Sequence, residues 1–315
     1  MLRILTILLL LCLPVLSSCQ QESTAKPVIV TTIKPVQALA YAVAGGVNSP
    51  LEVRQLLPDG ASPHHYSLKP SDMRTLGSAL AVFRIGSGLE TFLDKPLASL
   101  DPHTLIVTLT DTPGIQHLPA RSPHKHDAEE TASEHEQHTA GDAAPTEDLH
   151  LWLNPQNAIA MSHEIARVLA QVDPDHKADY ARNTSKLVER ILATDEHIRQ
   201  QLEPLRKRPY LSFHDAWQHF DTHYGLNFAG AVTLDASRLP GARHVQDIRH
   251  IVEQKQAICL FQEPQFSPSL IKTLMEGSTI RIGELDPLGM KLPLDENTYT
   301  NLMQAAADNF ERCLR

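Results

Sequence analysis

Four positions in the sequence carry side chains suited to metal binding, and each follows or adjoins a segment whose residue pattern predicts a strand. They are His64, His150, His214 and Asp286. Three imidazoles with a carboxylate or water satisfy the tetrahedral coordination that Zn²⁺ prefers, whereas Mn²⁺ prefers more oxygen ligands. His65 fits as well as His64 by position alone, and a single histidine after a strand is more often a polar turn residue than a ligand. The spacing predicts a zinc site only if the fold brings these positions together.

Histidine is unusually frequent, with 17 copies in 315 residues. Imidazole is the commonest metal-ligating side chain, so this enrichment favours a metal function. Residues 116–148 form an acidic, polar stretch with five histidines: His117, His124, His126, His135 and His138. A stretch with almost no apolar residues predicts a disordered loop, because it cannot bury enough surface to offset ordering entropy. Its histidines indicate weak auxiliary zinc binding, and a solvated acidic linker is the alternative interpretation. Four further histidines fit helix surfaces: His219, His223, His244 and His250.

One long helix, expected over residues 173–202, organises the elements that must position these side chains. Asp173 is the expected N-cap and Pro174 the first helical residue. Apolar or small residues recur at helical spacing along one face: Tyr180, Thr184, Leu187, Ile191, Thr194, Ile198 and Leu202. A helix of roughly thirty residues is about 45 Å long, which exceeds the width of a small domain.

Alternating strand and helix patterns lie on both sides of this helix. Strands are expected at 28–32, 51–57, 81–85 and 105–109, then at 210–213, 227–232, 257–261 and 279–285. Helices are expected at 35–44, 71–78 and 157–170 before the long helix. After it, one helix is expected to follow residues 214–217 and to end at about residue 224, and others are expected at 245–256, 268–275 and 298–313. Near-continuous apolar strands in such an order predict parallel sheets, with ligands bound at the carboxyl ends of the strands. The predicted fold is therefore α/β: two lobes, 27–170 and 205–315, each with a mainly parallel four-stranded sheet, bridged by one rigid spanning helix within 171–204.

The N-terminus predicts export. Residues 1–18 have a basic start and an apolar run too short to span a bilayer, as expected of a signal peptide, and residues 19–26 form a polar tether. The sequence before Cys19 resembles a bacterial lipoprotein cleavage box, which favours acylation of Cys19, with an ordinary signal peptide as the alternative. Outside the inner membrane, the pair Cys259 and Cys313 favours a disulfide over two buried free thiols.

The net charge of −9 argues against nucleic acid or an anionic membrane surface as partner and suits a cationic ligand. The apolar fraction of 42% and the charged fraction of 21% are those of a globular protein. At this length the chain can build two domains, each with its own core.

Several stretches, in order along the mature chain, resemble those of one known family. They are residues 57–64 (LPDGASPH) with Tyr66 and 69–72, then 150–153, 213–216, 263–266 and 285–289. On these residues the chain resembles the ZnuA-like zinc-binding proteins of bacterial ABC zinc importers, a group within the metal-specific solute-binding proteins. An acidic, histidine-rich insert ahead of His150 is typical of the zinc members.

The resemblance implies a cell-envelope protein, not an enzyme, that captures Zn²⁺ in the cleft between two lobes and delivers it to an inner-membrane ABC permease. It implies His64, His150 and His214 as ligands, and Asp286 matches a carboxylate that binds metal in related proteins. In some zinc members a glutamate precedes the first histidine, but here that residue is Pro63. The Cys259–Cys313 pair matches a disulfide of Gram-negative zinc members. A monomer without nucleic acid or an organic substrate is expected.

Two other function classes remain open from the sequence. A manganese carrier or adhesin of the same wider family would have a similar chain, although a third imidazole favours zinc. A zinc hydrolase would also use three histidines and an open position, with Asp215 or Glu263 as the base. The sequence lacks the His-Glu-x-x-His pattern of many zinc proteases.

Overall fold

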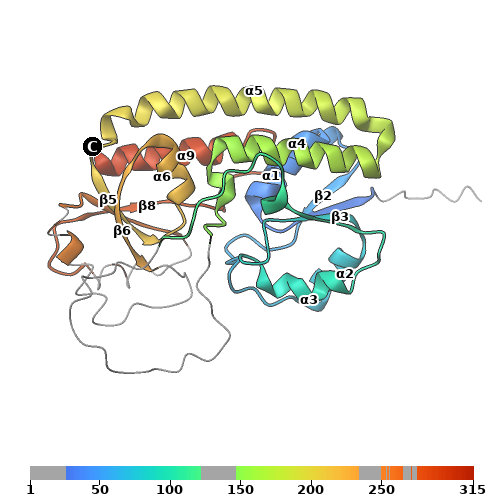
Figure 1. The fold of residues 1–315 in the computed structure, drawn as a ribbon, viewed down its shortest axis with the longest axis horizontal. Coiled ribbons are helices and arrows are strands. Elements are labelled where there is room, and N and C mark those ends of the chain that lie inside the picture. The colour runs from blue at the N-terminus through green and yellow to red at the C-terminus, as the bar shows by residue number, and fades with distance from the viewer. Residues whose placement is uncertain are drawn as a thin grey trace, which may run out of the picture.

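The computed structural model describes residues 26–121, 147–233, 250–252, 254, 256–264, 271 and 275–315 (Figure 1). Two parallel sheets of four strands each form the centres of two lobes, as the sequence predicts. The N-lobe sheet has the order β2-β1-β3-β4: β1 (Val28–Thr31), β2 (Glu52–Gln55), β3 (Ala79–Arg84) and β4 (Leu105–Thr108). The C-lobe sheet has the order β6-β5-β7-β8: β5 (Pro209–His214), β6 (Asn227–Thr233), β7 (Cys259–Gln262) and β8 (Arg281–Glu284).

Every strand pair in the described chain is parallel, and the registers run without interruption except for single shifts beside Val28 and Tyr210. Parallel strands need crossover connections, and helices supply them. The helices of the N-lobe are α1 (Lys34–Ala44), α2 (Pro70–Gly77), α3 (Asp94–Ala98) and α4 (Pro155–Val172). In the C-lobe, the helices whose full extent lies within the described residues are α6 (Gln218–Tyr224) and α9 (Thr298–Leu314). The helices expected at 245–256 and 268–275 lie largely outside the described residues.

Two helix ends follow the signals in the sequence. Gly45 ends α1 with a φ of 101°, in the left-handed region where a residue with a Cβ would be strained. Asn154 caps α4, since its side chain accepts the backbone N–H of Gln156, and Pro155 takes the first helical position. These caps fix where α1 ends and where α4 begins.

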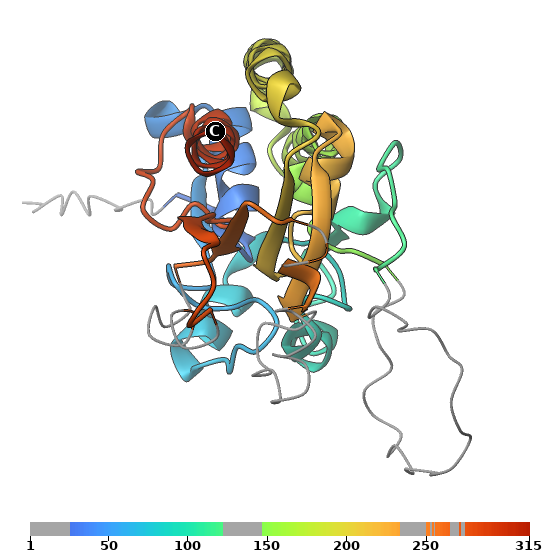
Figure 2. The ribbon, with the colours of Figure 1, turned by 90° about the vertical axis from the view of Figure 1, so that its left-hand side faces the viewer.

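The bridging helix α5 (Lys177–Leu202) runs along both lobes and packs on α1, α4 and α9 (Figure 1). Figure 2 shows α5 (yellow) and α9 (red) nearly end-on, both above the strands. The first predicted turn is a separate 3₁₀ segment, Pro174–His176, and the carboxylate of Asp173 makes no capping bond. It accepts instead from the Tyr180 hydroxyl at 2.6 Å and contacts His176 Nδ1 at 2.8 Å.

The buried face of α5 matches the predicted face at every position but one. Asp195 is buried where Thr194 was expected. The Asp195 carboxylate is 2.8 Å from Nε2 of His223 on α6, so a polar pair joins the helix to the C-lobe at this point. His223, expected on an exposed helix surface, is therefore part of this contact.

One hydrophobic cluster continues from the N-lobe through α5 into the C-lobe, and a smaller one lies within the C-lobe. In the C-lobe, Cys259 on β7 and Cys313 on α9 lie side by side, and their Cα atoms are 5.9 Å apart. Within the described ranges, we find no helix long and apolar enough to cross a membrane.

Candidate metal centre

Histidine rings from three distant segments meet where the carboxyl ends of the two sheets face each other. His64 lies in the loop after β2, His150 precedes the short 3₁₀ segment Leu151–Leu153, and His214 is the last residue of β5. The ring centroids are 5.5 Å apart for His64 and His150, 5.3 Å for His64 and His214, and 5.1 Å for His150 and His214. One nitrogen of each ring lies within 4.8 Å of the others. A single ion can contact all three from the space between them.

Two of the rings are oriented by buried carboxylates. Nδ1 of His150 is 2.7 Å from Oδ1 of Asp148, and Nδ1 of His214 is 2.9 Å from Oε1 of Glu263. A ring whose Nδ1–H donates to a carboxylate keeps Nε2 as a lone-pair donor for a metal. Nε2 of His214 is buried and, within the described chain, has no hydrogen-bond partner. The pattern of carboxylate, histidine and open nitrogen is that of a metal ligand with its supporting group.

The charges of the site favour a cation. Burial acts to raise the pKa of Asp148, but the adjacent His150, by charge and hydrogen bonding, lowers it overall. Asp148 therefore remains ionised at neutral pH. Burial acts to lower the pKa of His214, yet the charge and hydrogen bond of Glu263 raise it. A negative group thus supports each of these two rings, and a bound cation would neutralise that charge.

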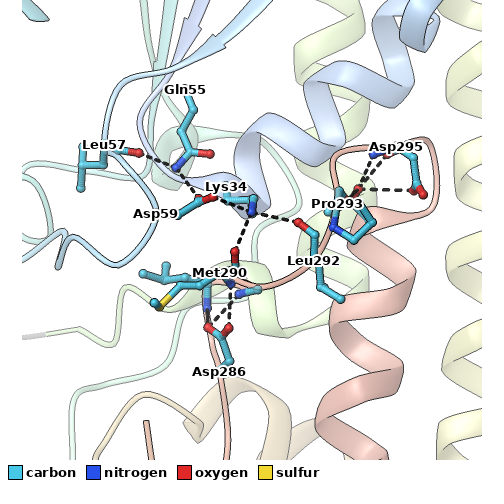
Figure 3. A network of polar contacts seen from close by, with 12 residues as sticks. Lys34, Gln55, Leu57, Asp59, Asp286, Met290, Leu292, Pro293 and Asp295 are labelled. Carbon is cyan, nitrogen blue, oxygen red and sulfur yellow. Dashed lines mark hydrogen bonds and ion pairs between the residues drawn. The ribbon is translucent and has the colours of Figure 1, made fainter. Parts of the chain in front are cut away.

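The structure separates His64 from its neighbour. His64 is half-buried within the cluster, while His65 is exposed and outside it. Asp286 is also outside the cluster. Its carboxylate accepts the backbone N–H groups of three residues in its own loop, at 3.1, 2.9 and 2.7 Å: Leu288, Gly289 and Met290 (Figure 3). A ligand role for Asp286 stays a prediction.

Of the five loop histidines only His117 lies in the described chain; His124, His126, His135 and His138 do not, and neither does Cys19. His117 is exposed, and its Nδ1 contacts the Glu147 carboxylate. The loop that was expected over 116–148 is ordered at both of its ends. Asp148 N–H donates to Leu118 O at 2.9 Å, and Pro119 forms an antiparallel bridge with Glu147.

Arg121, which the sequence did not single out, joins the two ends of this loop to the C-lobe. Its guanidinium donates to Asp215 at 2.7 Å and to both oxygens of Asp221 at 2.7 and 2.8 Å, and it lies 3.8 Å from the centre of the Phe228 ring. Burial raises the pKa of Asp221 to about 6 although Arg121 opposes the shift. We call these contacts of Arg121 with Asp215 and Asp221 the Arg121 clamp. Since Asp215 follows His214, the clamp fixes the chain beside a residue of the histidine cluster.

His219, expected on a helix surface, is wholly buried, so that prediction is wrong. Its Nε2 is 3.0 Å from the carbonyl oxygen of Asp148 and therefore donates to it. The spacing of α6 could not reveal this, because the partner lies 71 residues away in sequence. Asp148 itself had a local signal, a carboxylate two residues before a histidine.

A site of three imidazole nitrogens with buried carboxylate support has the donor set of a zinc site. Among the described residues, no other group of three or more His, Cys, Asp or Glu side chains comes this close. The described site can therefore bind one divalent cation, and imidazole donors suit Zn²⁺ better than Mn²⁺.

Comparison with known proteins agrees with this chemistry. The family described as "Zinc-uptake complex component A periplasmic" matches residues 29–313. The high-affinity zinc uptake system protein ZnuA of Brucella abortus is 35% identical over 308 residues, covering 91% of each chain. The protein of the same name from Yersinia pestis is 35% identical over 298 residues, covering 92% of each.

Solved structures show the same fold. A ZnuA crystal structure has a TM-score of 0.75 at 22% identity, covering 92% of this chain and 100% of that one. The periplasmic zinc-binding protein TroA of Treponema pallidum has a TM-score of 0.75 at 21% identity, covering 92% and 99%. With a family match over residues 29–313 and relatives at 35% identity, this protein belongs to the periplasmic zinc-uptake component A (ZnuA) family.

Proposed function

We propose that this protein captures Zn²⁺ in the cell envelope and delivers it to the permease of an ABC zinc importer. The observation that carries the proposal is the convergence of His64, His150 and His214, with nitrogens within 4.8 Å of one another. The names of the relatives, high-affinity zinc uptake proteins, support zinc as the cargo. We assign the three histidines as ligands, and water or a further side chain completes the coordination.

Binding fits the site better than hydrolysis does. A hydrolytic zinc needs a free base beside the metal-bound water. The first candidate base, Asp215, is held by Arg121 at 2.7 Å. The second, Glu263, is buried and bonded to His214 at 2.9 Å. Both carboxylates are thus engaged in positioning, which supports a transport role.

The proposal extends to the compartment. We assign residues 1–18 as a signal peptide and Cys19 as a lipid-attached N-terminus. A disulfide between Cys259 and Cys313 fits an oxidising envelope, and their Cα separation of 5.9 Å lies in the disulfide range. The protein acts as a monomer and has the permease as its partner. Metabolic labelling with a palmitate analogue tests the anchor: Cys19→Ser should abolish the label, and a labelled variant would exclude Cys19.

For the histidine-rich segment we propose weak auxiliary zinc binding. Removing residues 122–146 while keeping Arg121 and Glu147 preserves the contacts at the two ends of the loop, and one tight zinc site should remain. Loss of tight binding in this variant would move the main site into the segment.

The paired variants His64→Ala and His65→Ala test the cleft site with a matched control. His64 lies in the cluster, while its neighbour is exposed outside it. In competition between Zn²⁺ and Mn²⁺ on metal-stripped protein, zinc should win on the parent chain and on His65→Ala, and His64→Ala should lose tight binding. Equal zinc affinity in the two variants, or preference for Mn²⁺, would overturn the proposal.

A further inference from the structure

The ammonium of Lys34, the first residue of α1, is buried and fully hydrogen-bonded. Its Nζ donates to Asp59 Oδ2 at 2.9 Å, to Met290 O at 3.0 Å and to Leu292 O at 3.0 Å (Figure 3). An ammonium has three donors and here finds three acceptors. The side chain is 8% exposed, so water does not readily replace these partners.

The acceptors belong to different lobes. Asp59 lies in the His64 loop, defined as residues 58–67, which follows β2 in the N-lobe. Met290 and Leu292 lie in the Asp286 loop, defined as residues 286–292, which follows β8 in the C-lobe. Gln55 contacts both Leu57 O and Asp59, so the start of the His64 loop is itself held (Figure 3). Lys34 thus joins the loop of the first histidine to the opposite lobe.

The carboxylate of Asp286 gives the C-lobe partner its shape. By accepting three consecutive backbone N–H groups it folds the Asp286 loop into a tight turn that directs the Met290 carbonyl at Lys34 (Figure 3). The same loop receives the indole N–H of Trp152, which donates to Pro287 O at 2.7 Å. Trp152 is two residues from His150, so the loop contacts the segments of both N-lobe histidines.

We propose that Lys34 is a positioning residue for metal exchange, which holds the His64 loop against the Asp286 loop so that these contacts must break before His64 leaves the metal. The inference rests on the proposed zinc function of the histidine cluster. In this proposal Asp286 folds its own loop, and the contact between the two lobes controls the release of zinc.

Among the three histidines, His64 is the one whose withdrawal fits the structure. His150 and His214 are at most 7% exposed, and each is held by a buried carboxylate. His64 is half-buried on a loop whose neighbouring residue is exposed. His64 is thus the most exposed of the three rings, and Lys34 is a charged contact that restrains its loop.

The test compares Lys34→Met with Lys291→Met in the full mature chain. Methionine keeps most of the length of the side chain and removes the charge. Lys291 is in the Asp286 loop too, but it is exposed and pairs with Glu284 of its own lobe at 3.0 Å. Zinc dissociation is followed by mixing loaded protein with excess chelator. The thermal midpoint, Tm, is measured with and without zinc.

We expect Lys34→Met to release zinc about tenfold faster, because it loses hydrogen bonds to a charged group, and Lys291→Met to match the parent chain. The rise in Tm on adding zinc should shrink for Lys34→Met, since that rise reports metal affinity and not stability alone. Asp59→Asn, at a half-exposed position, provides a second variant and should accelerate release by a smaller factor.

A Lys34→Met protein with a lower Tm but the parent dissociation rate would overturn the inference, because Lys34 would then be merely structural. Unchanged release in Asp59→Asn together with an aggregated Lys34→Met would overturn it too. A parent chain without one tight zinc site would refute the proposed function instead, so the two failures are distinguishable.

Discussion

Replacing Asp148 by alanine should weaken zinc binding without removing a ligand. Oδ1 of Asp148 accepts from His150 twice, from the backbone N–H at 3.0 Å and from the ring Nδ1 at 2.7 Å. The ring would lose the bond that fixes its rotation and its tautomer, so that part of the unbound population would present the wrong nitrogen to the metal.

The size of the effect follows from the burial of the pair. Loss of a carboxylate behind a ligating histidine costs about 10–100-fold in metal affinity, which is about 1.4–2.7 kcal/mol. We expect the upper part of this range for Asp148→Ala, because the Asp148 side chain is 5% exposed and water has little access to replace two lost bonds. Asp148→Asn keeps an acceptor oxygen but not the charge, so it should cost only about tenfold.

Calorimetric competition against a chelator measures this directly. The matched control is Asp173→Ala, which removes another carboxylate bonded to a histidine Nδ1, that of His176 at 2.8 Å, away from the cluster. That variant should keep the parent zinc affinity. If Asp148→Ala also kept it, to within twofold or so, the carboxylate would not orient His150 and the reasoning would be refuted.

Three further predictions concern stability. Burial raises the pKa of Glu90 to about 7, so the folded state holds a proton that the unfolded state releases. The free energy of unfolding should therefore fall by about 3 kcal/mol as the pH rises from 4.5 to 7. A series of urea denaturations across this pH range should show the fall, and Glu90→Gln should flatten it. A disulfide between Cys259 and Cys313, 54 residues apart, should contribute about 4 kcal/mol that a reductant removes, with no loss of zinc stoichiometry; an unchanged denaturation midpoint would exclude the bond. Arg121→Met leaves the buried Asp221 uncompensated and should cost about 3–5 kcal/mol in chemical denaturation, whereas a cost below 1 kcal/mol would show that the clamp is not needed.

The fold was predictable because its signals are local and repeated. The apolar runs of β1, β3 and β5 and the helical spacing of α5 are read from neighbouring residues, and the structure has strands and a bridging helix there. The exception on α5, Asp195 in place of Thr194, depends on a partner 28 residues away, His223. Helical spacing predicts a buried stripe but does not reveal a polar pair within it.

The structure brings together the three histidines that the sequence proposed as ligands, whereas the contacts that support their rings were not predicted. Strand ends located His214, and the resemblance favoured His64 over His65. The roles of Arg121 and His219 could not be predicted, because each depends on a contact between segments that are distant in sequence. From the sequence alone, Arg121 at the edge of a polar stretch would be expected to face solvent, because its partners Asp215 and Asp221 lie about a hundred residues away.

The pH dependence of binding follows from the same geometry. Glu263 raises the pKa of His214, so protons compete with zinc at that ring from a higher pH than at an ordinary histidine. Zinc affinity should therefore decline as the pH falls, and the decline should begin at a higher pH than it would for an ordinary histidine.

The central claim is that three histidines from two lobes hold one zinc ion. Calorimetric titration of metal-stripped residues 20–315 with Zn²⁺, beside the variant with His64, His150 and His214 all changed to alanine, tests it most directly. We predict one tight site in the parent chain and only weak binding in the variant. Equally tight binding in both proteins would contradict the claim and place the site elsewhere in the chain.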